Sequence, residues 1–451
     1  MELNGKKIVV VGMAQTGIAT AQFLARGGAQ VTVSEAQPLA QLGTPAAELA
    51  RQGVLLETGG HCAETFLSAE LIVVSPGVPL NIAPLCQARA RGIEVISEIE
   101  LAYRFLRTPL IAVTGTNGKT TTTSLLGEMF QQAGRKVFVG GNIGTPLITY
   151  VAGVQDCAFV IAEISSFQLE GIKAFRPFIS VLLNITEDHL DRYQSFADYC
   201  RAKARIFQNQ TEHDIAVLNY DDPLVRTLEN SITARKIFFS TQQPLAAGIS
   251  YNGALHIKLQ GTAAQVSIAG AALSGMHNVE NMMAALAVGW MCGLPLAGME
   301  QTLKSFSGLK HRMEFVGTFR GVACYNDSKA TNVGAVVKSL ESLPAPLILI
   351  AGGKDKGGSY APLLSLLRDK VKLLVLLGEA RERMHAELSG AAETIMTATL
   401  EDAVQTAFSR ASAGDTVLFS PACSSFDMFT SYAHRGECFK ELVRALTSAT
   451  A

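Results

Sequence analysis

The sequence lacks the features that would direct a chain to nucleic acid, to a membrane or to an oxidising compartment. Its 451 residues contain 38 Lys and Arg against 39 Asp and Glu, so no basic excess favours a polyanionic partner. No apolar run is long enough to span a bilayer, and the one near the start is too short for a signal peptide. The eight cysteines form no Cys-x-x-Cys pair, which disfavours a zinc site or a disulfide framework. We therefore expect a cytoplasmic protein with free thiols.

Short β-branched runs alternate with helical stretches along most of the chain. Runs such as "KKIVVVG", "LIAVTG" and "LILIAGG" are typical of buried parallel strands. The length corresponds to about three domains. We predict an α/β fold of three doubly wound units, with a Rossmann-like domain at residues 1–97, a central domain at 98–308 and a Rossmann-like carboxy-terminal domain at 309–451, and antiparallel hairpins within residues 250–275.

The amino-terminal domain begins with a strand, a turn and a helix in "IVVVGMAQTGIATAQFLARGG", which predicts a Rossmann-like unit. Gly12, Ala14 and Gly17 stand where the dinucleotide fingerprint has three glycines, and Glu35 follows the next strand. Two interpretations stay open here: a purely structural start of the sheet, or a site for a ligand with a diphosphate. "VVSPGVP", which ends a later strand, would line the same crevice.

The stretch "TGTNGKTTT" has the parts of a phosphate loop but is shorter than the Walker A motif. Gly115 stands three positions before Gly118, whereas the Walker A glycine stands five positions before. A strand precedes the loop and a helix is expected from Thr120 onward, so backbone amides and a helix amino terminus would face an anion. We predict a central P-loop ATPase-like domain that binds nucleotide through Gly115, Thr116, Asn117, Gly118, Lys119, Thr120 and Thr121.

Three further side chains in the central domain suggest catalysis. Glu163 ends a predicted strand beside the loop, where a carboxylate suits Mg²⁺. His189 is either a metal ligand or a structural histidine. Lys203 falls on the apolar face of the helix in "SFADYCRAKARIFQ". It either snorkels to solvent, or burial favours a neutral amine that can react with carbon dioxide.

Several motifs occur in order along the whole chain and resemble those of the Mur ligase family. They are "TGTNGKTTT", "GGNIGTPL", "EISSFQLE", "NITEDHLDRY", "MHNVENMMAA", "HRME" and "NDSKATN". The resemblance implies that an amino acid is joined to a UDP-muramoyl carboxylate, with ATP cleaved to ADP through an acyl phosphate. "NDSKATN" together with "SPACSSFDMF" favours UDP-N-acetylmuramoyl-L-alanine and D-glutamate as the small-molecule substrates.

The resemblance also implies a role for particular residues. Lys119, His189, Lys203 and Lys329 would be catalytic, and Lys203 would carry a carbamate. Two Mg²⁺ ions are expected, held by Thr120, Glu163, His189 and Lys203. Asn278, Arg312 and Asp327 would bind the nucleotide. The substrates would contact Gln15, Thr16, Ser75, Asn142, Ser165, Thr331, Lys356, Ser425 and Tyr432. From the sequence pattern alone, Ser425 also stands where a strand is expected to give way to a helix, whose amino terminus would suit a carboxylate. We expect a monomer with no nucleic-acid or membrane partner.

The sequence departs from the family pattern at two places. Ala36 and Gln37 follow Glu35, where a threonine or an arginine is common, and Tyr432 stands in place of a phenylalanine. A sister ligase, including the folylpolyglutamate type, and a non-catalytic nucleotide switch or NAD-binding module are the alternatives. The amino-terminal domain disfavours the folate version, and Ala14 disfavours NAD.

Overall fold

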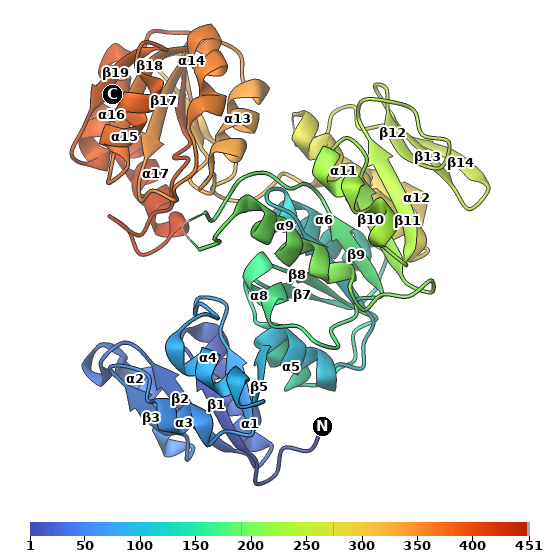
Figure 1. The fold of residues 1–451 in the computed structure, drawn as a ribbon. Helices are drawn as coiled ribbons and strands as arrows, with labels where there is room; N and C mark the ends of the chain where they lie inside the picture. The colour runs from blue at the N-terminus through green and yellow to red at the C-terminus, as the bar shows by residue number, and fades with distance from the viewer. Residues whose placement is uncertain (191, 274, 449–451) are drawn as a thin grey trace. The chain divides into compact units, whose positions relative to one another are not determined.

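The computed structural model describes residues 1–190, 192–273 and 275–448. It comprises two compact units, which are described one by one below (Figure 1). The first contains Met1–Ile185, Ala197–Ala269 and Glu280–Leu303, and the second contains Thr186–Phe196, Gly270–Val279 and the chain from Lys304 onward.

The chain begins with a parallel five-stranded sheet in the order β3-β2-β1-β4-β5. Its strands are β1 (Lys7–Val11), β2 (Gln30–Glu35), β3 (Leu55–Thr58), β4 (Leu71–Val74) and β5 (Glu94–Ser97). The connecting helices are α1 (Gln15–Arg26), η1 (Leu39–Gln41), α2 (Gly43–Arg51), α3 (Ala63–Leu67) and α4 (Ala83–Ala90). Since the strand order reverses between β1 and β4, the turns after these two strands form the crevice in which such sheets bind ligands.

Helix α5 (Glu98–Phe105) follows this sheet and packs against the central domain. The buried Glu100 carboxylate accepts hydrogen bonds from three consecutive backbone amides, at Lys173 (2.9 Å), Ala174 (3.0 Å) and Phe175 (2.8 Å). Glu98 accepts from the amide of Ile148 at 2.7 Å. Two carboxylates at the start of one helix therefore satisfy backbone donors that lie far away in the sequence.

The central sheet has nine strands in the order β14-β13-β12-β11-β10-β9-β6-β8-β7. These are β6 (Leu110–Thr114), β7 (Val137–Gly141), β8 (Phe159–Glu163), β9 (Ile179–Leu182), β10 (Ile215–Asn219), β11 (Arg235–Ser240), β12 (Gly248–Tyr251), β13 (Leu255–Leu259) and β14 (Thr262–Val266). β12, β13 and β14 pair antiparallel, which confirms the hairpins predicted within residues 250–275.

The helices of the central domain connect its strands or follow the last of them. They are α6 (Lys119–Gln132), α7 (Leu147–Val151), α8 (Ser166–Glu170), α9 (Phe196–Ala204), η2 (Arg205–Phe207), α10 (Pro223–Thr227), η3 (Glu229–Ser231), α11 (Met276–Met291) and α12 (Leu296–Ser305). β6 is fully buried between β9 and β8, and each of these strands presents its carboxyl end at one edge of the sheet. That edge holds the candidate site.

The third sheet has the order β15-β16-β20-β17-β18-β19, and only β15 pairs antiparallel among these strands. Its strands are β15 (Glu314–Phe319), β16 (Val322–Asn326), β17 (Leu347–Gly352), β18 (Val371–Leu377), β19 (Glu393–Met396) and β20 (Thr416–Phe419). Its helices are α13 (Val333–Ser342), η4 (Ala361–Leu363), α14 (Leu364–Lys370), α15 (Arg381–Leu388), α16 (Leu400–Arg410) and α17 (Tyr432–Ser448). The predicted α/β fold with three sheets is confirmed.

Buried aliphatic strands supply the core of each sheet, as the β-branched runs predicted. In the third sheet, two hydrophobic clusters lie around β17 and β18, one under α13 and α14 and the other under α16 and α17. All eight cysteines are free. Within the described residues, no helix is long and apolar enough to cross a membrane.

Candidate active site

The loop after β6 adopts a conformation that requires glycine at two positions. Gly115 has φ 153° and Gly118 has φ 84°, in the region that side chains disfavour. A Cβ on Gly118 would lie 2.2 Å from Oδ1 of Asn281, so the loop packs against α11 without room for one. α6 starts directly afterwards at Lys119, as predicted to within one residue. The short loop therefore presents its backbone in the manner of a phosphate cradle.

Asn184, which follows β9, supports this loop and was missed by the sequence reasoning. Its side-chain oxygen accepts from the amide of Asn117 at 2.8 Å, and its amide nitrogen donates to the Asn117 carbonyl at 3.2 Å. Its own carbonyl accepts from the amide of Thr116. Its position could have indicated this role, because Asn184 follows the predicted strand in "LLNIT", and polar residues at a strand end lie beside the loop of the neighbouring strand.

Lys119 and Lys203 converge on one backbone carbonyl. Each ammonium nitrogen donates to the carbonyl oxygen of Gly115 at 2.8 Å, and Lys119 also donates to that of Thr116. Lys203 is 1% exposed, and its nitrogen lies 4.6 Å from the ring centre of Tyr199. The interpretation that Lys203 snorkels to solvent is therefore wrong, because its nitrogen is buried at the phosphate loop.

Glu163, the last residue of β8, connects two loops. One carboxylate oxygen accepts from the Thr120 hydroxyl at 2.7 Å, and the other accepts from the Asn142 side chain at 2.8 Å. A carboxylate and a hydroxyl at this spacing are hard oxygen donors, which is the chemistry that Mg²⁺ prefers beside a phosphate. Thr120 and Glu163 therefore fit the magnesium site predicted for them. Nearby, Ser165 caps α8 in a reciprocal capping box with Gln168.

The crevice of the amino-terminal sheet is held by Glu35. Its carboxylate accepts from the backbone amides of Met13 (2.7 Å) and Gln37 (3.0 Å), which ties the turn after β1 to the end of β2. Ser75 is buried and donates to the Gly12 carbonyl. A Cβ on Gly17 would lie 1.9 Å from the Gly12 carbonyl oxygen, so this helix start needs glycine. Gln15 and Thr16 are the first two residues of α1.

In the second unit, two of the residues expected at the nucleotide, Arg312 and Asp327, lie on or bond to the segment that precedes β15. Asp327 is fully buried, and its carboxylate accepts from the Ser339 and Ser420 hydroxyls and from the amide of Met313. Burial raises its pKa in spite of these donors and of the nearby Arg312 guanidinium. Asn278 is buried at the start of α11.

Asp188 forms hydrogen bonds to two loops of this unit, those that contain Asn332 and Lys356. Its carboxylate accepts from Lys356 at 3.1 Å and from Asn332 at 3.0 Å. His189 is the next residue, has φ 57°, and places Nε2 3.6 Å from the same carboxylate. Because His189 belongs to the second unit and Lys203 to the first, their shared role in metal binding stays a prediction.

The residues expected to face the amino acid lie on loops of the third sheet. Lys329 and Thr331 follow β16, and the Lys329 nitrogen lies 5.3 Å from the ring centre of Tyr432. Ser425 is 2% exposed. The expectation that Ser425 starts a helix is wrong: α17 begins seven residues later, at Tyr432, because residues 424–431 form a bridge and turns.

Arg435, on the first turns of α17, was not predicted and joins two of these loops. Its guanidinium donates to the carbonyls of Ser328, Cys423 and Ser424. It is 2% exposed, and burial lowers its pKa to about 10. A single arginine within a helix gives no signal of such a role in the sequence, because the carbonyls that it binds lie on distant loops.

The three α/β sheets and the shortened phosphate loop with two converging lysines define a nucleotide-binding protein of several domains. Family profiles match three segments: "Mur ligase MurD-like, N-terminal domain" at residues 6–97, "Mur ligase middle domain" at 113–289 and "Mur ligase, glutamate ligase domain" at 311–423. The chain belongs to the Mur ligase family.

Curated relatives resemble the chain over its whole length. The UDP-N-acetylmuramoylalanine–D-glutamate ligase of Geotalea daltonii is 55% identical over 447 residues, with 99% of each chain covered. The protein of that name from Geobacter metallireducens is 50% identical, again with 99% of each covered.

Solved structures share the fold at lower identity. A pseudomurein peptide ligase type C from Methanothermus fervidus is 19% identical with a TM-score of 0.63, covering 98% of this chain and 100% of the other. MurF ligase from Thermotoga maritima, in complex with ADP, is 18% identical with a TM-score of 0.63, covering 100% and 97%.

Proposed function

We propose that this chain joins D-glutamate to UDP-N-acetylmuramoyl-L-alanine, with the cleavage of ATP to ADP and phosphate. The observation that carries the proposal is the identity of 50% or more, over 99% of the chain, with relatives named for that reaction. The phosphate loop with Lys119, Lys203 and Glu163 around it supports an ATP-dependent step. We further propose that the protein acts as a monomer in the cytoplasm.

The reaction divides into two group transfers. The carboxylate of the UDP-linked substrate takes the γ-phosphoryl group of ATP, which forms an acyl phosphate and releases ADP. The amine of D-glutamate then attacks the acyl carbon through a tetrahedral intermediate, phosphate leaves, and the amine gives up a proton. Phosphoryl transfer of this kind needs no covalent bond to a protein side chain. The protein therefore has chiefly to align the reactants and to neutralise the negative charge of the phosphates.

The first unit would bind the phosphates. The backbone amides from Gly115 to Thr121 surround the anion, and Lys119 places its charge at the transferred phosphoryl group. Thr120 and Glu163 would hold Mg²⁺, which neutralises phosphate charge when bound. Asn142, whose side chain already bonds to Glu163, and Ser165 would contact the UDP-linked substrate from the adjacent loops, while Gln15, Thr16 and Ser75 would contact its nucleotide.

We propose that Lys203 becomes a carbamate that, with His189, holds a second Mg²⁺. The ammonium would first lose a proton, and the neutral amine would then attack carbon dioxide, forming an N–C bond and releasing a second proton, which converts a cation into an anionic oxygen ligand. A carbamate keeps one N–H, so the hydrogen bond to the Gly115 carbonyl can persist. ¹³C NMR of protein equilibrated with ¹³C-bicarbonate should give a carbamate signal that is absent from Lys203→Ala.

In the second unit, Asn278, Arg312 and Asp327 would hold the nucleotide, and Lys329 and Thr331 would lie near the transferred phosphate. Asp327 would act chiefly through the loop that it orders, because its carboxylate is buried and already accepts three hydrogen bonds. Lys356, Ser425 and Tyr432 would face D-glutamate. The Tyr432 hydroxyl adds a polar contact that a phenylalanine would lack.

Phosphate release is the decisive measurement. Purified protein with ATP, Mg²⁺ and UDP-N-acetylmuramoyl-L-alanine would be tested with D-glutamate, L-glutamate, L-lysine, meso-diaminopimelate and L-alanine. We expect release with D-glutamate only, and none when either substrate is omitted. Release with another amino acid would keep the ligase mechanism but overturn the assignment of Lys356, Ser425 and Tyr432. No release with any of them would overturn the proposed reaction.

A further inference from the structure

A polar cluster in the second unit surrounds the segment that contains Arg312. The residues on each side of Arg312 have positive φ, 63° at His311 and 44° at Met313, a region that is unfavourable for both. Backbone conformations of this kind persist only where surrounding contacts enforce them, and they often lie at functional sites. The contacts that enforce this one therefore control where Arg312 points.

Backbone groups at both ends of the segment form hydrogen bonds to the loop after β16, one to its backbone and one to the carboxylate of Asp327. The His311 carbonyl accepts from the amide of Lys329 at 2.9 Å, and the Met313 amide donates to Asp327 at 3.1 Å. Arg312 thus lies between two hydrogen bonds, to Lys329 and to Asp327, the residues that are proposed to bind the nucleotide together with it. A shift of the His311 backbone would move Arg312 and Lys329 together.

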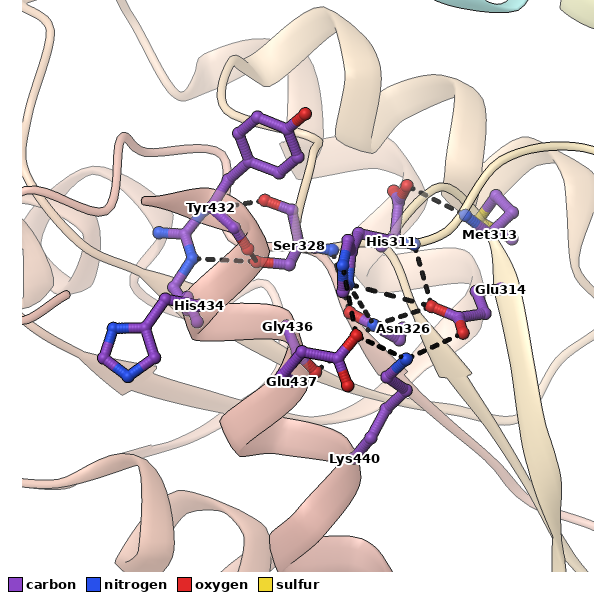
Figure 2. A network of polar contacts seen from close by, with 12 residues as sticks. His311, Met313, Glu314, Asn326, Ser328, Tyr432, His434, Gly436, Glu437 and Lys440 are labelled. Atoms are coloured by element: carbon purple, nitrogen blue, oxygen red, sulfur yellow. Dashed lines mark hydrogen bonds and ion pairs between the residues drawn. The ribbon is translucent and has the colours of Figure 1, made fainter. Parts of the chain in front are cut away.

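The imidazole of His311 is buried and has a defined tautomer. Nδ1 accepts from the Asn326 amide nitrogen at 3.0 Å, and the orientation of that amide follows from its oxygen, which accepts from Ser328. The proton therefore lies on Nε2, which faces a Glu437 oxygen at 3.5 Å (Figure 2). Gly436 allows this approach, since a Cβ there would lie 2.3 Å from Nδ1.

Lys440, one turn further along α17, completes the cluster. Its ammonium lies 2.9 Å from Glu314 and 2.9 Å from Glu437, and the residue is 5% exposed (Figure 2). Glu314 in turn accepts from the His311 amide at 2.8 Å and from Asn326 at 3.1 Å. One lysine therefore fixes both carboxylates that face His311: Glu314, which binds its backbone amide and lies 3.8 Å from Nδ1, and Glu437, which faces Nε2. The Lys440 and His311 side chains are buried, whereas the Glu314 and Glu437 side chains are 23% and 45% exposed, so solvent screens the ion pair with Glu314 less than the one with Glu437.

We propose that Lys440 and Glu437 are positioning residues for the nucleotide, acting through His311 on Arg312 and Lys329. The inference rests on the proposed function in so far as Arg312 and Lys329 serve the nucleotide. Neither α17 side chain touches substrate in this proposal: each keeps His311 in its left-handed conformation, and thereby sets the angle at which the next guanidinium leaves the backbone.

The test separates nucleotide from amino-acid binding. Lys440→Met and Glu437→Gln would be compared with Glu441→Gln, which makes the same chemical change at an exposed position of α17. We expect the KM for ATP and the Kd for Mg·ADP to rise about tenfold in the first two variants, as for the loss of a hydrogen bond to a charged group. The KM for D-glutamate should change less than about twofold, and Glu441→Gln should match the wild type.

Two further readouts keep the test decisive. Lys440→Arg, which retains the charge, should restore most of the Mg·ADP affinity, whereas a merely structural role would be served by Met as well. An unchanged Kd for Mg·ADP in both variants, or equal changes in the KM of ATP and D-glutamate, would overturn the proposal. If the wild type binds Mg·ADP but shows no turnover with D-glutamate, the proposed reaction fails while the Kd comparison still decides the role of α17.

Discussion

Glu98 should destabilise the protein at alkaline pH, and its replacement by Gln should remove that effect. The side chain is 1% exposed; one oxygen accepts from Ile148, and among the described residues the other has no hydrogen-bond partner. Burial raises its pKa from 4.5 to about 7, against the lowering effect of the Ile148 and Leu147 amides. The folded protein therefore holds a neutral carboxylic acid below that pH.

The sign follows from proton binding. Between pH 4.5 and about 7 the unfolded chain releases the proton that the folded chain keeps, so the stability contributed by Glu98 is lost as pH rises through this window. At 1.36 kcal/mol per pH unit, the free energy of unfolding should fall by about 3 kcal/mol across this window because of Glu98. Gln keeps the acceptor for Ile148 and cannot ionise. The free energy of unfolding of Glu98→Gln, relative to that of the wild type, should therefore increase by about that amount between pH 4.5 and pH 8.

Urea denaturation of wild type and Glu98→Gln at pH 4.5, 6 and 8 would measure this shift, because the fixed cost of the new amide cancels when one pH is compared with another. Glu64→Gln, which makes the same change at an exposed carboxylate of the amino-terminal domain, is the control and should show no comparable shift in the same direction. A Glu98→Gln difference that stays constant from pH 4.5 to 8 would refute the reasoning, since it would mean that Glu98 is ionised in the folded protein throughout.

Three other results are expected. Lys119→Ala should lower kcat by about 100- to 1,000-fold, whereas the exposed Lys136→Ala should not; unchanged turnover of Lys119→Ala would remove the phosphate-loop assignment. Lys203→Ala should be nearly inactive and partly rescued by added formate or acetate, and an active variant would argue against a carbamate. Burial, with smaller effects of Arg312 and Lys338, lowers the pKa of His277 to about 4, so stability should fall as pH drops from 6.5 toward 4. In urea denaturation, the free energy of unfolding of His277→Asn should no longer fall over this pH range. A variant with the same pH dependence as the wild type would contradict the assignment to His277.

The sequence was sufficient to predict those features that depend on a local pattern of residues. The apolar runs predicted the parallel strands, and the strand–Gly115–Lys119–helix order predicted the phosphate loop because glycine conformation and helix amino termini are local properties. The inward position of Lys203 followed from its helical spacing to Tyr199, and its burial is confirmed. These features needed no knowledge of distant contacts.

The supports of the site could not be predicted in this way. Asn184 and Arg435 bind backbone groups, and Lys440 binds the Glu314 carboxylate, at positions far away in the sequence, and nothing in the neighbouring residues indicates these contacts. The error at Ser425 has the same origin: Ser424 forms a bridge with Lys354, and the residues that follow form bends and a turn before α17 begins. Contacts of long sequence separation decided each of these cases.

The bonds that Glu100 makes to Lys173, Ala174 and Phe175 bear on where this polypeptide can be divided. A fragment that began at β6 would lose α5 and leave three adjacent amides without their acceptor, at a cost of several kcal/mol. A fragment that began at Glu98 would retain it. Although α5 follows the first sheet without interruption, it is thermodynamically a part of the next domain, so a fragment that begins at Glu98 should resist urea better than one that begins at Leu110.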